Sequence, residues 1–258
     1  MGRPFQPGDE VLLVDSKDRT YLATLKAGGE FHTHAGVTPH DAMIGLAEGA
    51  TVRSNTGARY LVLRPTLAEF VLTMPRGAQV VYPKDLGPLL IMVDVFAGAR
   101  VLEAGVGSGA LSLALLRAGA TVIGYEVRAD FAAVALGNVE RFLGPTPAYA
   151  VHDRDVYEGI DEPDLDRVML DLPEPWRVLK HAERALRPGG ILCAYLPTIG
   201  QVAELHQGLE ASAFGMAKTV EVLERSWHVK GQSVRPDHRM VAHTGFLTAA
   251  RLLTPEAP

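Results

Sequence analysis

One stretch of eleven residues limits what this chain can fold into more than any other. From Val101 to Leu111 it reads VLEAGVGSGAL, an apolar segment that runs directly into a glycine-rich loop. Glycines let the backbone turn sharply and let a ligand approach it, and a helix that begins after such a loop offers free N–H groups. We therefore expect a strand, a ligand-binding loop and a helix in that order, as in Rossmann-like folds.

The segments on either side of this loop alternate between strand-like and helix-like patterns. Strands are predicted at 100–104, 121–126, 148–151, 167–171 and 190–196. Helical patterns occupy 84–93, 110–118, 129–143, 175–186 and 201–209. This order predicts an α/β fold with a parallel sheet covered by helices on both faces. Two later stretches, 220–229 and 243–252, are expected to form an antiparallel hairpin at the end of the sheet.

The first part of the chain has a different pattern. Its segments are short and alternating, and Gly, Pro and Asn interrupt them; the strand-like stretches are 10–14, 21–25, 51–53, 60–63 and 69–72. The turn signal Asn55-Thr56-Gly57 separates two of them. We therefore predict a small β-rich domain over residues 1–75 and the α/β domain over residues 76–258.

The composition excludes several classes of protein. Hydrophobic residues make up 47% of the chain and charged residues 21%, which is enough apolar surface to build a core and argues against disorder. A single cysteine, Cys193, excludes a disulfide-stapled scaffold. No apolar run approaches the roughly 18 to 20 residues that span a bilayer, and Met1 to Glu10 does not resemble a signal peptide. We expect a cytoplasmic protein.

The residues of the glycine loop indicate which ligand it binds. Gly105, Gly107 and Ala110 satisfy the dinucleotide pattern G-x-G-x-x-A, which is a weak match by itself. Glu103 argues against a dinucleotide, because a carboxylate facing the ligand would repel a pyrophosphate. It would instead attract the ammonium group of S-adenosylmethionine, which carries no phosphate. The predicted cofactor-binding residues of the loop are Glu103, Gly105, Gly107, Ser108, Gly109, Ala110 and Leu111.

Acidic residues also follow the next two predicted strands. Glu126 comes 21 residues after Gly105, where a carboxylate can accept both ribose hydroxyls of an adenosine. Asp153 and Asp155 follow the strand at 148–151, and such a strand end meets the adenine edge in this fold. Asp153 is the candidate acceptor for the exocyclic amine, with Asp155 and a plain acidic loop as open alternatives.

The fourth strand ends in a segment that combines an acid, two prolines and an aromatic residue. It reads DLPEPW from Asp171 to Trp176. Ligands bind at the carboxyl ends of parallel strands, and the prolines stiffen the loop. The segment resembles the Asp/Asn-Pro-Pro-aromatic element of amine-directed nucleic-acid methyltransferases, in which the polar side chain accepts a hydrogen bond from an amino group. Asp171 is therefore a candidate for both cofactor binding and catalysis.

Several motifs in a fixed order together resemble one family. They are Tyr82-Pro83-Lys84-Asp85, the glycine loop, Asp171–Trp176 and 243–247, and in the first domain Phe31-His32-Thr33-His34, His40-Asp41 and Ile44-Gly45. The chain is similar over nearly its whole length to the bacterial tRNA adenine-N1 methyltransferases that modify position 58 in the T loop, and the first-domain motifs resemble their actinobacterial members. The compact loop at 144–163 and the short C-terminal tail depart from the family pattern.

The resemblance implies a fold, an activity and an assembly. The fold would be a Rossmann-like class I S-adenosylmethionine-dependent methyltransferase sheet with a small N-terminal β domain, and the assembly would be a homotetramer. Asp171 would be the catalytic carboxylate and Tyr82 would line the pocket for the target base. By accepting a hydrogen bond from the adenine N6 amine, Asp171 would orient N1 and stabilise the developing positive charge.

The charge distribution suggests where an acidic polymer binds. The chain has a net charge of −5, yet residues 223–251 hold five Lys and Arg against two Asp and Glu. A basic segment on an acidic body is compatible with a local phosphate contact, although a solvated edge explains it equally well. The predicted contacts to tRNA are Arg76, Lys84, Arg235 and Arg239.

Other interpretations of the same residues remain open. The glycine loop also fits a methyltransferase for another acceptor, such as a protein carboxylate or a small molecule, and the chain also fits a noncatalytic tRNA-binding subunit. His32, His34 and His40 invite a metal site, but no pair of cysteines supports one, so we expect no metal.

Overall fold

The structure is a computed structural model that describes residues 2–77 and 79–254. The chain divides into two compact units with the boundary between Pro75 and Arg76, and residues 141–144 group with the first unit. No helix within the described residues is long and apolar enough to cross a membrane.

The first unit is built on a four-stranded antiparallel sheet in the order β2-β1-β6-β5. Its strands are β1 (Glu10–Asp15), β2 (Thr20–Thr24), β5 (Thr51–Arg53) and β6 (Arg59–Leu63). A two-stranded sheet of β3 (Glu30–Thr33) and β4 (Gly36–Pro39) and a short 3-10 helix (His40–Ala42) complete it. Alternate residues of these strands point inward, so Leu13, Tyr60 and Val62 form a core with Phe5 and Met43.

The end of the first unit corrects one expectation, because residues 69–72 do not form a strand. They lie in helix α1 (Leu67–Thr73). The Thr66 hydroxyl accepts a hydrogen bond from the Glu69 N–H at 3.3 Å, and the Glu69 carboxylate accepts one from the Thr66 N–H at 2.8 Å. This reciprocal capping box stabilises the first turn of a helix, and the Thr-x-x-Glu spacing in the sequence is its signal.

The second unit contains a seven-stranded sheet in the order β12-β15-β11-β10-β7-β8-β9. The five strands from β11 to β9 are parallel, and β15 runs antiparallel between β11 and β12. The predicted parallel α/β sheet is confirmed. The strands are β7 (Arg100–Ala104), β8 (Thr121–Tyr125), β9 (Tyr149–His152), β10 (Leu165–Leu170), β11 (Leu186–Leu196), β12 (Phe214–Glu221) and β15 (Phe246–Leu252).

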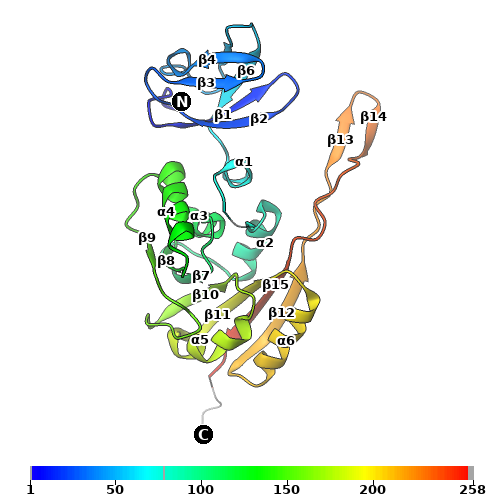
Figure 1. Cartoon of the computed structure of the whole chain (residues 1–258). Helices are drawn as coiled ribbons and strands as arrows, with labels where there is room; N and C mark the ends of the chain where they lie inside the picture. Colours follow the sequence, from blue (N-terminus) through cyan, green and yellow to red (C-terminus); the bar gives the residue numbers. More distant parts are fainter. Residues whose placement is uncertain (1, 78, 255–258) are drawn as a thin grey trace. The chain divides into compact units, whose positions relative to one another are not determined.

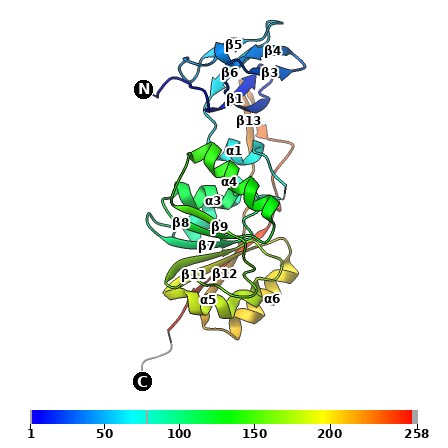
Figure 2. The same ribbon diagram turned by 60° about the vertical axis from the view of Figure 1, so that its left-hand side comes forward.

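Helices cover both faces of this sheet. Figures 1 and 2 show α2 (Pro83–Met92), α3 (Ala110–Arg117) and α4 (Ala129–Leu143) on one side. On the other side lie the 3-10 helix Pro175–Val178, α5 (Leu179–Ala185) and α6 (Ile199–Glu210). Apolar residues of α5 and α6 such as Leu179 and Leu205 pack with Leu102, Val168 and Leu192 of the sheet.

The stretch 220–229 does not form a single strand, which corrects a second expectation. Strand β12 ends at Glu221, and Trp227–Lys230 instead forms β13, which pairs with β14 (Ser233–Pro236). This hairpin projects from the edge of the sheet (Figure 1). The expected antiparallel pairing at the end of the sheet is present between β12 and β15.

The carboxyl ends of β7, β8, β10, β11 and β12 all lie at one edge of the sheet, together with the start of β15. This edge carries the candidate site.

Candidate active site

The glycine loop lies between the end of β7 and the start of α3. Gly105, Gly107 and Gly109 all have positive φ angles, of 81°, 56° and 82°. A side chain at Gly105 would place its Cβ 2.2 Å from the carbonyl oxygen of Asp171. The loop therefore needs glycine both for its backbone conformation and because the end of β10 lies directly against it.

Glu103 is the penultimate residue of β7, just before the loop, and is buried. Its carboxylate accepts a hydrogen bond from the Ser112 hydroxyl at 2.6 Å, and the Tyr149 hydroxyl lies 3.0 Å from the Ser112 oxygen. Burial raises the pKa of Glu103 to about 8; the nearby Asp171 charge adds to this shift, and the bond from Ser112 opposes it. At neutral pH this acid holds a proton that a cationic ligand would displace.

Glu126 bridges the glycine loop and the turn after β8. One carboxylate oxygen accepts a hydrogen bond from the Gly107 N–H and the other from the Arg128 N–H, each at 3.0 Å. A carboxylate has about four lone-pair positions, so Glu126 keeps the capacity to accept bonds from a ligand.

A cavity of about 120 Å³ lies beside Glu126. Apolar groups of Ala104, Val127, Val156 and Leu172 form much of its wall, and Asp155 is part of its lining. Asp153 is exposed and does not line it. Of the two acids that the sequence left open, Asp155 is placed better than Asp153 to meet a ligand here.

A second, smaller cavity also borders the glycine loop. It measures about 10 Å³ and is lined by Glu103, Gly105, Gly107, Ser108, Ala110, Leu111 and Asp171, together with Gln79, Val80 and Val81. No motif in the sequence indicates that residues 79–81 belong to the site. Because this volume holds about one water molecule, a larger ligand group requires residues 79–81 or the glycine loop to move.

Two polar groups that line this cavity have no hydrogen-bond partner within the described part of the chain. The buried Ser108 hydroxyl is one of them. The Asp171 carboxylate is the other: its backbone N–H donates to Ala104, but no hydrogen bond or ion pair reaches its side chain from the described residues. Burial raises the pKa of Asp171 to about 7. A buried hydroxyl is normally paired, so Ser108 indicates a ligand, and the partly buried Asp171 carboxylate is free to accept a bond from one.

The predicted tRNA contacts differ in their surroundings. Arg76, Arg235 and Arg239 are exposed, and Arg235 lies in β14 of the projecting hairpin. Lys84 is buried, and its ammonium donates to Asp85 at 2.8 Å and to the Val222 carbonyl at 2.6 Å. A phosphate contact at Lys84 does not fit this structure, because its charge is already neutralised inside the protein. Tyr82 is partly buried and forms the N-cap position of α2.

The histidines of the first unit take part in polar contacts within that unit. His40 Nδ1 accepts a hydrogen bond from the Lys26 N–H, His34 contacts Arg19, and His32 lies 3.1 Å from Glu30. Over residues 2–77 and 79–254, no three His, Cys, Asp or Glu side chains come together in a way that holds a metal ion.

The residues at this edge fit S-adenosylmethionine. A buried acid at Glu103 suits an ammonium group, Glu126 suits a ribose diol, and the apolar cavity with Asp155 suits an adenine. The free Ser108 hydroxyl and the loop N–H groups supply further donors at the start of α3.

Comparisons with known proteins agree with this site. Residues 59–235 match the family described as "tRNA methyltransferase complex GCD14 subunit", and residues 4–52 match "TrmI-like N-terminal". The tRNA (adenine(58)-N(1))-methyltransferase TrmI of Thermus thermophilus is 42% identical over 245 residues, which cover 93% of this chain and 96% of that protein. A Methanocaldococcus jannaschii enzyme named for adenines 57 and 58 is 34% identical, with 93% and 94% covered.

Solved structures share the fold over almost the whole chain. A Thermotoga maritima structure named as an S-adenosylmethionine-dependent O-methyltransferase superposes with a TM-score of 0.93 at 33% identity, covering 99% of this chain and 97% of that one. The tRNA (m1A58) methyltransferase TrmI of Aquifex aeolicus gives a TM-score of 0.85 at 30% identity, covering 98% and 100%. The class I S-adenosylmethionine-dependent methyltransferase fold is thus confirmed, and the chain belongs to the GCD14 family of tRNA methyltransferase subunits.

Proposed function

We propose that this protein transfers a methyl group from S-adenosylmethionine to N1 of adenine 58 in the T loop of tRNA. The observation that carries the proposal is the Asp171 carboxylate, which lines the cavity beside the glycine loop with no partner among the described residues. The names of the Thermus and Aquifex relatives support the choice of substrate. Because tRNA is the substrate, we place the enzyme in the cytoplasm.

The cofactor supplies an electrophilic methyl group on a sulfonium when it is bound. Glu103 would hold its ammonium group, Glu126 its ribose hydroxyls, and the cavity lined by Val127, Val156 and Leu172 its adenine. Asp155 lies in the lining of that cavity and takes the adenine role in place of Asp153. Gly105, Gly107 and Gly109 allow the loop backbone to approach the ligand closely.

Asp171 would orient the target base and stabilise its charge. Its ionised carboxylate would accept a hydrogen bond from the adenine N6 amine, which fixes the position of N1. As N1 gains positive charge, the attraction to the carboxylate increases, and a preorganised group of this kind stabilises the transition state more than the ground state. Because burial raises its pKa to about 7, activity would rise as the pH passes through neutrality.

Tyr82 and the segment before it would complete the base pocket. Val80 and Val81 line the same cavity as Asp171, and Tyr82 follows them directly at the start of α2. An aromatic ring can stack on a base that has been exposed from the T loop, and such a contact is worth about 1–3 kcal/mol. Exposing the base costs on the order of a few kcal/mol, so the stacking offsets much of that cost.

The projecting hairpin would supply phosphate contacts. Its register places His228 opposite Arg235 and Lys230 opposite Ser233, so these polar residues share one face. Trp227, Val229 and Val234 lie on the other face and are exposed. We assign the basic face, with Arg239 and Arg76, to the tRNA backbone.

We also propose that the protein assembles as a homotetramer, whose mass light scattering can measure.

A second acceptor chemistry has an observation in its favour. The Thermotoga maritima structure is named as an O-methyltransferase, and a carboxylate with a pKa of about 7 could take a proton from a hydroxyl group. Methylation of a tRNA ribose hydroxyl would then leave N1 unchanged.

One experiment separates these outcomes. Unmodified tRNA is incubated with the protein and methyl-labelled cofactor, and the digested nucleosides are separated. We expect the label in 1-methyladenosine, and none in the same tRNA carrying guanine at position 58. Label in a 2′-O-methylated nucleoside would support the second chemistry, and an unlabelled product would contradict both.

A further inference from the structure

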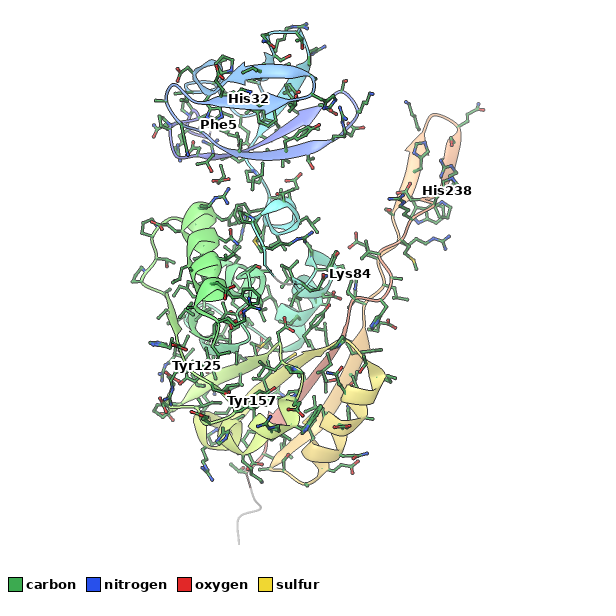
Figure 3. The ribbon with its side chains drawn as sticks, in the orientation of Figure 1. Phe5, His32, Lys84, Tyr125, Tyr157 and His238 are labelled. Carbon is green, nitrogen blue, oxygen red and sulfur yellow. The ribbon has the colours of Figure 1, made fainter. Side chains whose placement is uncertain are left out.

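Lys84 and Asp85 form a buried ion pair at the start of α2. The Lys84 ammonium lies 2.8 Å from the Asp85 carboxylate, and both side chains are almost completely buried. The same ammonium donates to the carbonyl of Val222 at 2.6 Å. Figure 3 places Lys84 beside the base of the projecting hairpin.

Asp85 is held from the opposite side of the hairpin base. Its second carboxylate oxygen accepts a hydrogen bond from the Thr244 hydroxyl at 2.6 Å, and the Tyr195 hydroxyl lies 3.5 Å away. Gly245 packs directly on the Tyr195 ring, since a Cβ there would lie 2.5 Å from the ring. The pair therefore contacts both chain segments that lead into and out of the hairpin: Val222 just after β12 and Thr244 just before β15.

The same pair adjoins the segment that lines the candidate active site. The backbone N–H of Asp85 donates to the Tyr82 carbonyl at 2.8 Å, which closes the first turn of α2 behind Tyr82. Val80 and Val81, just before Tyr82, line the cavity with Asp171. Burial raises the pKa of Tyr195; the bond with Thr244 opposes this shift, and the charges of Asp85 and Asp171 add to it.

We propose that Lys84 and Asp85 are positioning residues that fix the base of the hairpin relative to Tyr82, so that the basic hairpin and the base pocket engage the same tRNA. The proposal rests on the proposed tRNA function. It assigns Lys84 a role inside the protein in place of a phosphate contact. Neither residue touches the cofactor cavities, so cofactor binding should not depend on them.

Physical chemistry separates this role from simple stability. Removing one member of a buried ion pair leaves a charge without compensation, whereas replacing both with apolar residues of similar size is often neutral or stabilising. A merely structural pair should therefore be replaceable. A positioning pair should not be, because apolar side chains cannot bond to the Val222 carbonyl and the Thr244 hydroxyl.

The test compares Lys84→Met, Asp85→Leu and the double variant with both changes. We expect each single change to lower Tm by roughly 10 °C and the double variant to recover most of that loss. We expect the double variant to bind S-adenosylhomocysteine within about twofold of wild type, while kcat/KM for tRNA falls at least tenfold. Thr244→Val removes one bond at constant shape and should lower kcat/KM in the same direction by a smaller factor.

Hydrogen exchange measures the positioning without tRNA. In the double variant and in Thr244→Val, amides of 222–244 should exchange faster, whereas those of 100–111 should keep the wild-type rate. Lys180→Met, which breaks the exposed pair with Glu183 on α5, is the matched control and should change none of these quantities.

Three outcomes would overturn the proposal. One is a double variant with wild-type tRNA kinetics, another is unchanged exchange at 222–244, and the third is a parallel loss of cofactor affinity. A wild-type protein that does not methylate tRNA would overturn the proposed function itself, and this proposal with it.

Discussion

Two aspartates at the same edge of the sheet have opposite surroundings. Asp85 is buried with a lysine, a threonine hydroxyl and a tyrosine hydroxyl around its carboxylate. Asp171 lines a cavity, and no side-chain partner lies among the described residues. Burial raises the pKa of Asp171 to about 7.

The difference separates a carboxylate whose partners all lie within the protein from one that is free to bind a ligand. A buried carboxylate without partners destabilises the folded protein unless it is protonated or something binds to it. On the glycine-loop side of the edge, Asp171 has no side-chain partner among the described residues and Glu103 accepts one bond, from the Ser112 hydroxyl. On the hairpin side, Asp85 is satisfied within the chain. The comparison therefore supports the proposal that Asp171 acts on a ligand and that Asp85 supports the structure beside it.

Replacing Asp171 should give the largest effect. Asp171→Ala removes the group that would stabilise charge on the base, and we expect turnover to fall by roughly a hundredfold to a thousandfold, or about 2–4 kcal/mol. Asp171→Asn should lie between, since its carbonyl still accepts a hydrogen bond but carries no charge. Titration with S-adenosylhomocysteine checks that cofactor affinity is kept. If Asp171→Ala kept wild-type turnover, Asp171 would have no catalytic role, and the proposed difference in role between Asp171 and Asp85 would be wrong.

Gly105→Ala should give the next largest effect. The new Cβ would lie 2.2 Å from the Asp171 carbonyl oxygen at a φ of 81°, so the loop must shift away from β10. We expect cofactor affinity to fall by more than about tenfold, on the scale of 1–2 kcal/mol of backbone strain. Gly119→Ala is the control, because its φ of 89° imposes similar strain away from the site. It should lower Tm and leave calorimetric cofactor affinity unchanged.

Cofactor binding should release a proton from Glu103. Burial raises its pKa to about 8, so at pH 7 the carboxyl is mostly protonated. An arriving ammonium group would lower that pKa and expel the proton. S-adenosylhomocysteine carries the ammonium but no sulfonium. Phosphate and Tris differ in the heat with which they take up a proton, so the binding heat measured by calorimetry at pH 7 should differ between them. The difference should correspond to the release of up to about one proton. Proton release should disappear above pH 9, where Glu103 is mostly ionised, and in Glu103→Gln, which has no such proton. It should persist in the control Asp85→Asn, because Asp85 lines neither cavity. Equal heats in both buffers would contradict it.

Local patterns were enough to predict much of the fold and the position of the glycine loop between a strand and a helix. The glycine spacing at 105–109 and the alternation of strands and helices depend on neighbouring residues, and the structure has the predicted parallel sheet. Residues 69–72 were misread as a strand because four apolar or mixed residues fit either element, although Thr66 and Glu69 carried the helix signal.

Contacts between distant segments could not be predicted in the same way. Lys84 was expected to contact tRNA, because nothing near it in sequence shows that its partner is the carbonyl of Val222, 138 residues away. The pairing of Ser112 with both Glu103 and Tyr149 and the place of residues 79–81 beside Asp171 likewise arise only from the tertiary fold. That Asp155 lines the cavity beside Glu126, whereas Asp153 does not, depends on the path of one loop.

Replacing the exposed arginines of the hairpin region should give the smallest effect, and it extends the comparison of paired and unpaired residues from acids to cations. Lys84 is buried and paired, whereas Arg235 and Arg239 are exposed and form no ion pair within residues 2–77 and 79–254. Only exposed cations can release counterions from tRNA, and each lost phosphate contact should lower the slope of log affinity against log salt by about 0.7–0.9. Arg235→Ala and Arg239→Ala should therefore weaken tRNA binding and flatten that slope, with cofactor affinity unchanged.

Two further variants serve as controls: Tyr82→Ala, and the double variant with Lys84→Met and Asp85→Leu. Both should reduce turnover and keep the wild-type salt slope, because stacking and positioning involve no counterions. A salt series of tRNA binding for the four variants measures this, and a wild-type slope for both arginine variants would show that the phosphate path lies away from the hairpin.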